Sequence, residues 1–246
     1  GYIASSENFS LKNNSHNIAR ELERGEIIFI DENGIESSFI NKNKESPCIF
    51  EHIYFSFPSG LFSNISVPSA RIALGRQLAK EEKEKGMLIK DAVVVYAPDS
   101  ALLAAEGYAT ESNLRLIHRL IRSHYQPSPR SFMARPDSRA LAVDSKHNTI
   151  NDDIFGNKII LIDDSIVRGD TSSKLIKLLR NAGALEVHVR IPSAPIQNPC
   201  IYGINMKSHE EFIAYNRNTN EIKEKIGANS LLYLSIEGMH KAIGLP

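Results

Sequence analysis

The segment over residues 157–191 constrains the fold of this chain more than any other. Its four consecutive apolar residues, 159–162, are typical of a strand buried on both faces of a parallel sheet. Apolar residues then recur at helical spacing until Gly183, which ends the expected helix, and a second strand is expected over residues 187–191. The segment therefore predicts a strand–loop–helix–strand unit of an α/β protein with a mainly parallel central sheet.

The loop between that strand and that helix carries chemistry. Asp163 and Asp164 end the strand, where ligands of open parallel sheets bind, and two carboxylates can accept hydrogen bonds from a vicinal diol or hold a divalent cation. Residues 168–172 open the helix, so their N–H groups and the helix dipole favour a phosphate. Together these features predict a sugar-phosphate site. The alternative is that the acids are turn residues and that Asp170 or Thr171 only caps the helix.

Composition bounds the possible functions. Of 246 residues, 42% are hydrophobic and 24% charged, as in ordinary globular proteins, and 29 basic residues balance 29 acidic ones. Neither nucleic acid nor a membrane is therefore an expected partner, and no apolar run or signal peptide points to a membrane or to export. Two widely spaced cysteines fit a reducing cytoplasm. A chain that begins at Gly1, without Met, is expected to be a processed product or part of a longer protein.

The sequence IILIDDSIVRGDTSS, residues 159–173, resembles the phosphoribosyl pyrophosphate (PRPP) motif of the type I phosphoribosyltransferases. With YAPDSALLAAEGYATES and GALEVHVRIPSAPIQNPCIYGIN, it resembles the amidophosphoribosyltransferase family over almost the whole chain. The resemblance implies a type I phosphoribosyltransferase fold, a central mainly parallel sheet flanked by helices. Residues 1–45 would be a remnant of the end of a glutaminase domain with a linker hairpin, and residues 46–246 the phosphoribosyltransferase domain.

The resemblance also implies a reaction, the Mg²⁺-dependent transfer of the 5-phosphoribosyl group from PRPP to ammonia. Asp163 and Asp164 would hold the ribose hydroxyls or Mg²⁺, and Ser100 would share the metal. The implied PRPP-binding residues are Asp99, Ser100, Asp163, Asp164, Ser165, Arg168, Gly169, Asp170, Thr171 and Ser172. The implied catalytic residues are Asp163, Asp164, Arg130 and Lys146.

Departures from the family pattern leave other functions open. The nucleophilic cysteine of the glutaminase is missing, so ammonia would come from solution or from a separate glutaminase. Asp144 stands in place of an arginine and Asp170 in place of a threonine, while Pro127 and Pro129 stiffen the expected catalytic loop. The alternatives are a regulatory or catalytically impaired relative that keeps the PRPP pocket, or a transferase acting on another amine. A homo-oligomer is expected.

Local patterns outside the motif predict further features. Cys48 and Cys200 match two of the four cysteines that hold an iron–sulfur cluster in one branch of the family; two thiolates cannot complete that cluster, and both are expected to be buried. A strand is expected over the aromatic residues 48–57, and a hairpin with Asn33 and Gly34 at its turn over residues 25–40. Helices are also expected over residues 69–86, 101–111, 210–226 (interrupted near residues 216–220) and 237–243, and strands over residues 92–96 and 231–234.

Overall fold

The computed structural model describes residues 2–13, 20–40, 46–122, 147–149, 153–201, 204 and 208–244. The chain divides into two compact units, Gly1–Ser69 and Ala70–Pro246. In this described part, no helix has the length and apolar character needed to cross a lipid bilayer. The division into a remnant over residues 1–45 and a domain over residues 46–246 stays a prediction.

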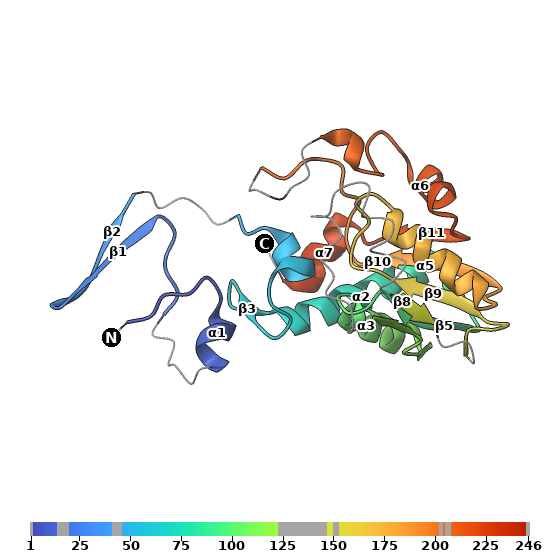
Figure 1. Cartoon of the computed structure of the whole chain (residues 1–246), viewed down its shortest axis with the longest axis horizontal. Helices are drawn as coiled ribbons and strands as arrows, with labels where there is room; N and C mark the ends of the chain where they lie inside the picture. The colour runs from blue at the N-terminus through green and yellow to red at the C-terminus, as the bar shows by residue number, and fades with distance from the viewer. Residues whose placement is uncertain are drawn as a thin grey trace. The chain divides into compact units, whose positions relative to one another are not determined.

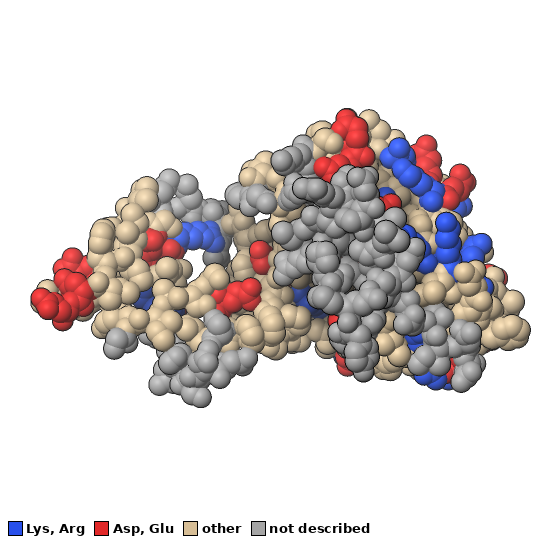
Figure 2. Space-filling model, in the orientation of Figure 1, with Lys and Arg blue, Asp and Glu red and all other residues tan. Residues whose placement is uncertain are grey.

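An antiparallel hairpin stands out in the first unit (Figure 1). The first elements are α1 (Asn8–Asn13), β1 (Glu26–Asp31) and β2 (Gly34–Phe39). The hairpin predicted over residues 25–40 is confirmed, but Asp31 pairs with Gly34, so the turn consists of Glu32 and Asn33. The Asp31 carboxylate accepts the Asn33 N–H at 2.7 Å and the Gly34 N–H at 3.1 Å, which accounts for this register. Figure 2 shows acidic side chains at the tip, where the strands carry Asp31 and Glu36 and the turn carries Glu32.

The strand predicted over residues 48–57 is wrong, because part of this segment is helical. The helical element η1 spans Glu51–Phe55. Its adjacent residues His52 and Ile53 are both buried, whereas a strand would direct their side chains to opposite faces. A short antiparallel pair follows, formed by β3 (Leu61–Phe62) and β4 (Ile65–Ser66).

The prediction that both cysteines are buried is also wrong. Cys48 is exposed and Cys200 is half-buried, and both are free thiols. Each lies in an irregular segment, Cys48 just before η1 and Cys200 well past the last strand residue that precedes it. Neither side chain is therefore carried into a core by a strand or a helix.

Five parallel strands form the central sheet of the second unit (Figure 1). In spatial order they are β11 (Ser230–Tyr233), β10 (Glu186–Ile191), β9 (Lys158–Ile162), β5 (Ala92–Tyr96) and β6 (Arg115–Leu116). All of β5 and the last four residues of β9 are buried, as expected for central strands covered on both faces. The predicted α/β class with a parallel central sheet is confirmed.

Helices cover both faces of this sheet (Figure 1). They are α2 (Val67–Glu84), α3 (Leu102–Ser112), α5 (Asp170–Asn181), α6 (Thr219–Ile226) and α7 (Ile236–Ile243). Right-handed connections place α3 on one face and α5 with α6 on the other, and α2 packs with α3. The remaining short elements are β7 (Leu120–Arg122), β8 (His147–Thr149) and η4 (His209–Glu211).

Most predicted elements of this unit lie within two residues of the observed ones. The strand predicted over residues 92–96 is β5, and the helices predicted over residues 69–86 and 101–111 are α2 and α3. The interruption predicted near residues 216–220 of the helix over residues 210–226 is confirmed, although it is longer than expected: η4 ends at Glu211 and α6 begins at Thr219. Asn218 caps α6, because its side-chain oxygen accepts the N–H groups of Asn220 and Glu221 and its own N–H donates to the Glu221 carboxylate. The helix therefore starts anew at this point.

Two glycines let α2 and α3 cross in direct backbone contact. A Cβ atom on Gly75 would lie 1.9 Å from the Ala104 carbonyl oxygen, and one on Gly107 would lie 1.9 Å from the Ile72 carbonyl oxygen. A larger side chain at either position would separate the helices. The crossing therefore sets how closely α2 approaches the helix that follows β5.

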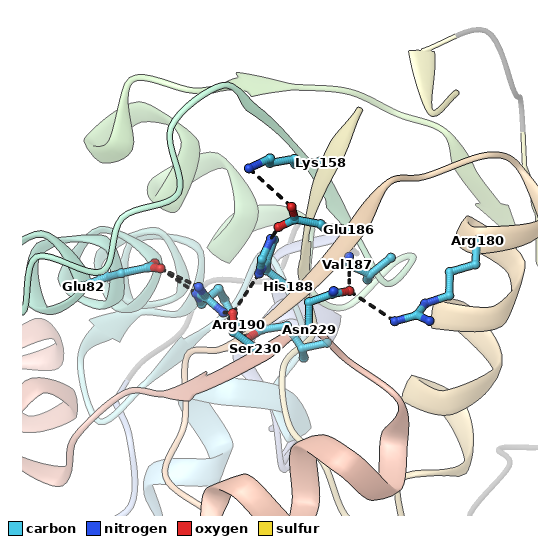
Figure 3. Close-up of polar contacts among 10 residues, drawn as sticks. Glu82, Lys158, Arg180, Glu186, Val187, His188, Arg190, Asn229 and Ser230 are labelled. Atoms are coloured by element: carbon cyan, nitrogen blue, oxygen red, sulfur yellow. Dashed lines mark hydrogen bonds and ion pairs between the residues drawn. The ribbon is translucent and has the colours of Figure 1, made fainter. Parts of the chain in front are cut away.

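A buried polar network joins the helices of that face to the sheet (Figure 3). Arg190 on β10 donates to Glu82 Oε1 of α2, from Nε at 2.9 Å and from Nη2 at 2.5 Å. Its Nη1 donates to Ser230 Oγ on β11 at 2.9 Å, and the Tyr108 hydroxyl of α3 donates to Glu82 Oε2. Only 1% of the Arg190 side chain and 0% of the Glu82 side chain are exposed. The network thus links two helices and two strands through one enclosed ion pair.

Candidate functional site

The carboxyl ends of β5 and β9 mark the point at which the strand order reverses. From β5 the chain moves outward to β6, and from β9 it moves the other way, through β10 to β11. Ligands of open α/β sheets bind at such a switch point. Ser100 lies in the turn after β5, and Asp163 and Asp164 follow β9 directly. The predicted site residues therefore flank the position at which this fold binds ligands.

The two acids connect both sides of the switch point. Asp163 is 6% and Asp164 is 8% exposed. The Asp163 carboxylate accepts the Asp164 backbone N–H at 3.0 Å and the Ser172 hydroxyl. The Asp164 carboxylate accepts the hydroxyl of Ser165 at 2.7 Å and that of Ser100. Hydrogen bonds thus join the turn after β5, the acid pair and the first turn of α5.

The acid pair carries an electrostatic cost. Burial raises the pKa of Asp163 well above its ordinary value, and the neighbouring Asp164 charge raises it further. Burial also raises the pKa of Asp164, although hydrogen bonds from Ser100 and Ser165 and the charge of Arg71 oppose the rise. The Arg71 side chain, on α2, is itself buried. A cation or a ligand rich in hydroxyl groups would relieve this cost, because either stabilises the ionised carboxylates.

The start of α5 has the features of an anion site. Its N-cap is Gly169, with φ of 89°, and no side chain caps the helix. The N–H groups of the first turn, residues 170–172, have no acceptor within the helix and point outward from its positive end. Asp170 is exposed at the first helical position, so the alternative that Asp170 or Thr171 serves as the N-cap is wrong.

A later segment forms the wall of the loop before α5. The Arg168 guanidinium forms an ion pair with Glu211 of η4, so it is directed at that carboxylate. A Cβ atom on Gly169 would lie 2.5 Å from Ile213 Cδ1 and 3.2 Å from Ile226 Cγ2. A glycine is therefore needed at position 169 for two reasons: the backbone has a positive φ, and side chains packed against it leave no room for a Cβ. Only the backbone of Arg168 is therefore directed into the loop, because its side chain is paired with Glu211.

The structure brings some of the predicted site residues together and does not describe others. Five of them are joined by the hydrogen bonds given above: Ser100, Asp163, Asp164, Ser165 and Ser172. Asp99 is exposed and Thr171 half-buried, each beside a member of that group in the chain. Arg130 and Lys146 lie outside the described residues, as do the departures at Asp144, Pro127 and Pro129.

The sequence did not point to three buried residues at this edge of the sheet: Arg71, Ser193 and Tyr233. Arg71 stands between apolar residues at the start of α2, and a charge in such a position signals a buried cation. Burial and the Asp163 charge raise the pKa of Tyr233, which ends β11. Ser193 follows β10 and is buried. For Ser193 and Tyr233, the sequence could have indicated a role only through their position at the carboxyl ends of β10 and β11, which lie at the same edge of the sheet as that of β9.

Other features do not compete with this site. A groove of about 570 Å³ lies at the amino edge of the sheet, lined by the end of α3 and the start of β6, and holds none of the predicted site residues. Across the described ranges, no three His, Cys, Asp or Glu side chains converge as ligands for a metal ion. Asp163 and Asp164 supply two carboxylates, a number that suits Mg²⁺ when phosphate oxygens complete its shell.

We expect Gly169→Ala to destabilise the protein more than Gly227→Ala. Both residues have a positive φ, so an alanine at either position lowers the free energy of unfolding by about 1–2 kcal/mol. At Gly227 no further cost arises, because no atom lies within 4 Å of the added Cβ. At Gly169 the new methyl group would also displace Ile213 and Ile226, adding about 1–3 kcal/mol. Urea unfolding of the two variants measures the difference. Equal losses would show that the loop wall yields freely.

We expect Asp163→Asn to raise the melting temperature at pH 7 in EDTA. The raised pKa means that the folded state holds a proton that the unfolded state releases above about pH 3.9, so this group lowers stability as the pH rises. The gain should vanish near pH 3, where both states are protonated. Asp153→Asn is the control with the opposite sign, because hydrogen bonds from Arg119 and Arg115 lower the pKa of Asp153. A lower melting temperature for Asp163→Asn at pH 7 would contradict the assignment.

Known proteins resemble this chain over nearly its full length. No family model matches it. An amidophosphoribosyltransferase of Pyrococcus horikoshii is 41% identical over 234 residues, 95% of this chain and 50% of that protein. A solved glutamine PRPP amidotransferase of Bacillus subtilis, complexed with ADP and GMP, is 39% identical with a TM-score of 0.84, over 97% of this chain and 51% of that one.

A second solved structure, an allosteric regulatory enzyme of purine biosynthesis, is 38% identical with a TM-score of 0.85, over 97% of this chain and 50% of that one. The chain thus spans about half the length of the proteins that it matches. In sequence and in its type I phosphoribosyltransferase fold, the chain belongs to the amidophosphoribosyltransferase family.

Proposed function

We propose that this chain supplies a phosphoribosyl-transfer site, which moves the 5-phosphoribosyl group of PRPP to ammonia and gives 5-phosphoribosylamine and pyrophosphate. One observation carries the proposal. A buried pair of carboxylates, Asp163 and Asp164, lies at the switch point and is hydrogen-bonded to the first turn of a helix without a side-chain cap. Diol-binding groups and phosphate-binding groups are therefore held at a short, set separation.

The two ends of a ribose 5-phosphate fit this arrangement. The carboxylates of Asp163 and Asp164 would accept hydrogen bonds from the ribose hydroxyls. These hydrogen bonds would replace those to water that the two buried carboxylates have lost. The N–H groups of residues 170–172 would bind the 5-phosphate, helped by the positive end of α5. Arg168 supports the loop from outside through its ion pair with Glu211. Binding at both ends would orient the anomeric carbon toward the acceptor.

The donor set also fits Mg²⁺, which prefers oxygen ligands and often uses one or two carboxylates with substrate phosphates. Asp163, Asp164 and the Ser100 hydroxyl would hold it, and their hydrogen bonding already groups these oxygens. When bound, Mg²⁺ would neutralise part of the negative charge of PRPP. The raised pKa values of both acids support such a site, because a divalent cation stabilises the ionised pair.

In the proposed reaction, the bond from the anomeric carbon to the pyrophosphate oxygen breaks and a bond to the ammonia nitrogen forms. The nitrogen then releases a proton, and pyrophosphate leaves with the electron pair. The ribose ring carries positive character on the way, so the nearby carboxylates would stabilise it. The chain's residues bind and orient the sugar phosphate and keep water from the anomeric carbon.

The source of ammonia and the assembly are also proposals. The solved B. subtilis relative is named for glutamine and PRPP, and this chain spans about half of it. We expect ammonia to come from a glutaminase part of the same protein, from a separate glutaminase or from solution. A cytoplasmic homo-oligomer remains the expected state.

We expect the double variant Asp163→Asn, Asp164→Asn to lose PRPP binding, with affinity at least about 100-fold lower, because a sugar diol and Mg²⁺ both need the carboxylates. Isothermal titration with PRPP, with and without Mg²⁺, measures this loss, and Asp153→Asn serves as control. A pyrophosphate-release assay with ammonium at mildly alkaline pH then tests turnover. Unchanged affinity in the double variant would remove the proposed site. Tight binding without release would favour a regulatory protein instead.

We expect Asp170→Thr to strengthen PRPP binding about two- to fivefold. The exposed carboxylate at the first position of α5 repels a phosphate at the same helix end, an effect of about 0.3–1 kcal/mol. The gain should shrink at high salt, because the charge is exposed and therefore screened. Titration of the control Glu224→Thr, which removes a charge from an exposed position on α6, should show no gain. Equal affinities of Asp170→Thr and the native chain at low salt would contradict the expectation.

A further inference from the structure

Two buried hydroxyl groups at the carboxyl edge of the sheet make no hydrogen bond within the described part of the protein. They are Ser193 Oγ and Tyr233 Oη. Ser193 is 1% and Tyr233 is 8% exposed. A buried hydroxyl group without a partner is unfavourable, so such groups in a folded protein call for an explanation. Tyr108 offers the contrast, because its equally buried hydroxyl donates to Glu82.

Strand register places the Tyr233 side chain on the Asp163 side of the sheet. Tyr233 pairs with Ile191 on the neighbouring strand β10. Asp163 continues β9 next to Ile191, since its N–H donates to the Arg190 carbonyl at 3.2 Å. Residues in register on parallel strands project from the same face. Tyr233 and Asp163 therefore share the face that α5 covers.

Electrostatics agrees with this placement. The Asp163 charge acts on the Tyr233 hydroxyl, and together with burial it raises the pKa of that tyrosine. The hydroxyl therefore stays protonated and able to donate. Ser193 follows Ile191 by two residues, beyond the end of β10, at the same carboxyl edge. The Tyr233 hydroxyl and the Asp163 carboxylate thus face one part of the site, and Ser193 lies beyond the end of the strand between them.

We propose that the Tyr233 and Ser193 hydroxyls form a subsite beside Asp163 for one hydroxylic oxygen, a ribose hydroxyl of the bound sugar phosphate. The inference rests on the proposed function and deepens it. A ribose hydroxyl can donate to the carboxylate while it accepts from a neutral hydroxyl. An ionised phosphate oxygen only accepts hydrogen bonds, so it could not donate to the Asp163 carboxylate. An apolar group would leave both hydroxyls without a partner.

The test compares three ligands on four proteins. Isothermal titration with PRPP, ribose 5-phosphate and pyrophosphate is run on the native chain, Tyr233→Phe, Ser193→Ala and Tyr108→Phe. We expect Tyr233→Phe and Ser193→Ala to weaken the two ribose ligands by about 2- to 12-fold, as for the loss of one hydrogen bond. Pyrophosphate, which lacks ribose, should bind all four proteins equally. Tyr108→Phe removes the same atom from a buried tyrosine elsewhere and should leave every affinity unchanged.

Melting temperatures without ligand separate a ribose from a resident water. We expect Tyr233→Phe to melt at or above the native temperature, because its hydroxyl has no partner in the described structure, and Tyr108→Phe to melt lower. Unchanged affinity for ribose 5-phosphate in both site variants overturns the inference. A lower melting temperature of Tyr233→Phe with unchanged affinity also overturns it and assigns the hydroxyls to a bound water. Failure of the native chain to bind either ribose ligand instead overturns the proposed function.

Discussion

The enclosed ion pair between Glu82 and Arg190 is the contact on which the second unit depends. Both side chains are shielded from water, so each charge is tolerated only because its partner and the Tyr108 and Ser230 hydroxyls satisfy it. The pair holds α2 to β10, and the glycine crossing holds α2 to α3. Together they determine where the first turn of α2 lies, and therefore bring the buried cation Arg71 close to the acid pair.

The acid pair shows how this architecture makes a binding site at the expense of stability. Parallel strands end at a common edge, so loops from β5 and β9 converge there without special folding. Burial of Asp163 and Asp164 is unfavourable for the protein alone, as their raised pKa values indicate. The same burial would strengthen contacts to a sugar or a cation, because little water competes for the carboxylates. The positive charge of Arg71 offsets part of the negative charge of the acid pair.

The sequence predicted what depends on neighbours in the chain. The apolar run of β9, its two acids and the glycine before α5 lie in one short segment, so their arrangement follows from local patterns. Residues 48–57 were misassigned because aromatic and β-branched content favours strands, whereas the burial of His52 beside Ile53 is set by tertiary packing. Tyr233 was missed for a similar reason. Its nearness to the acids depends on the order of strands, which no local pattern specifies.

The wall of the phosphate loop has a consequence for how the site is acquired. Arg168 meets Glu211, 43 residues later in the chain, and Gly169 packs against Ile213 and Ile226, which come later still. A nascent chain that ends after β10 would contain the entire motif but none of the side chains that enclose it. Because distant closures are entropically costly and slow, the loop matures late, although its own residues emerge early. Truncated chains would therefore contain the sequence motif but lack the side chains that pack against the loop at the start of α5.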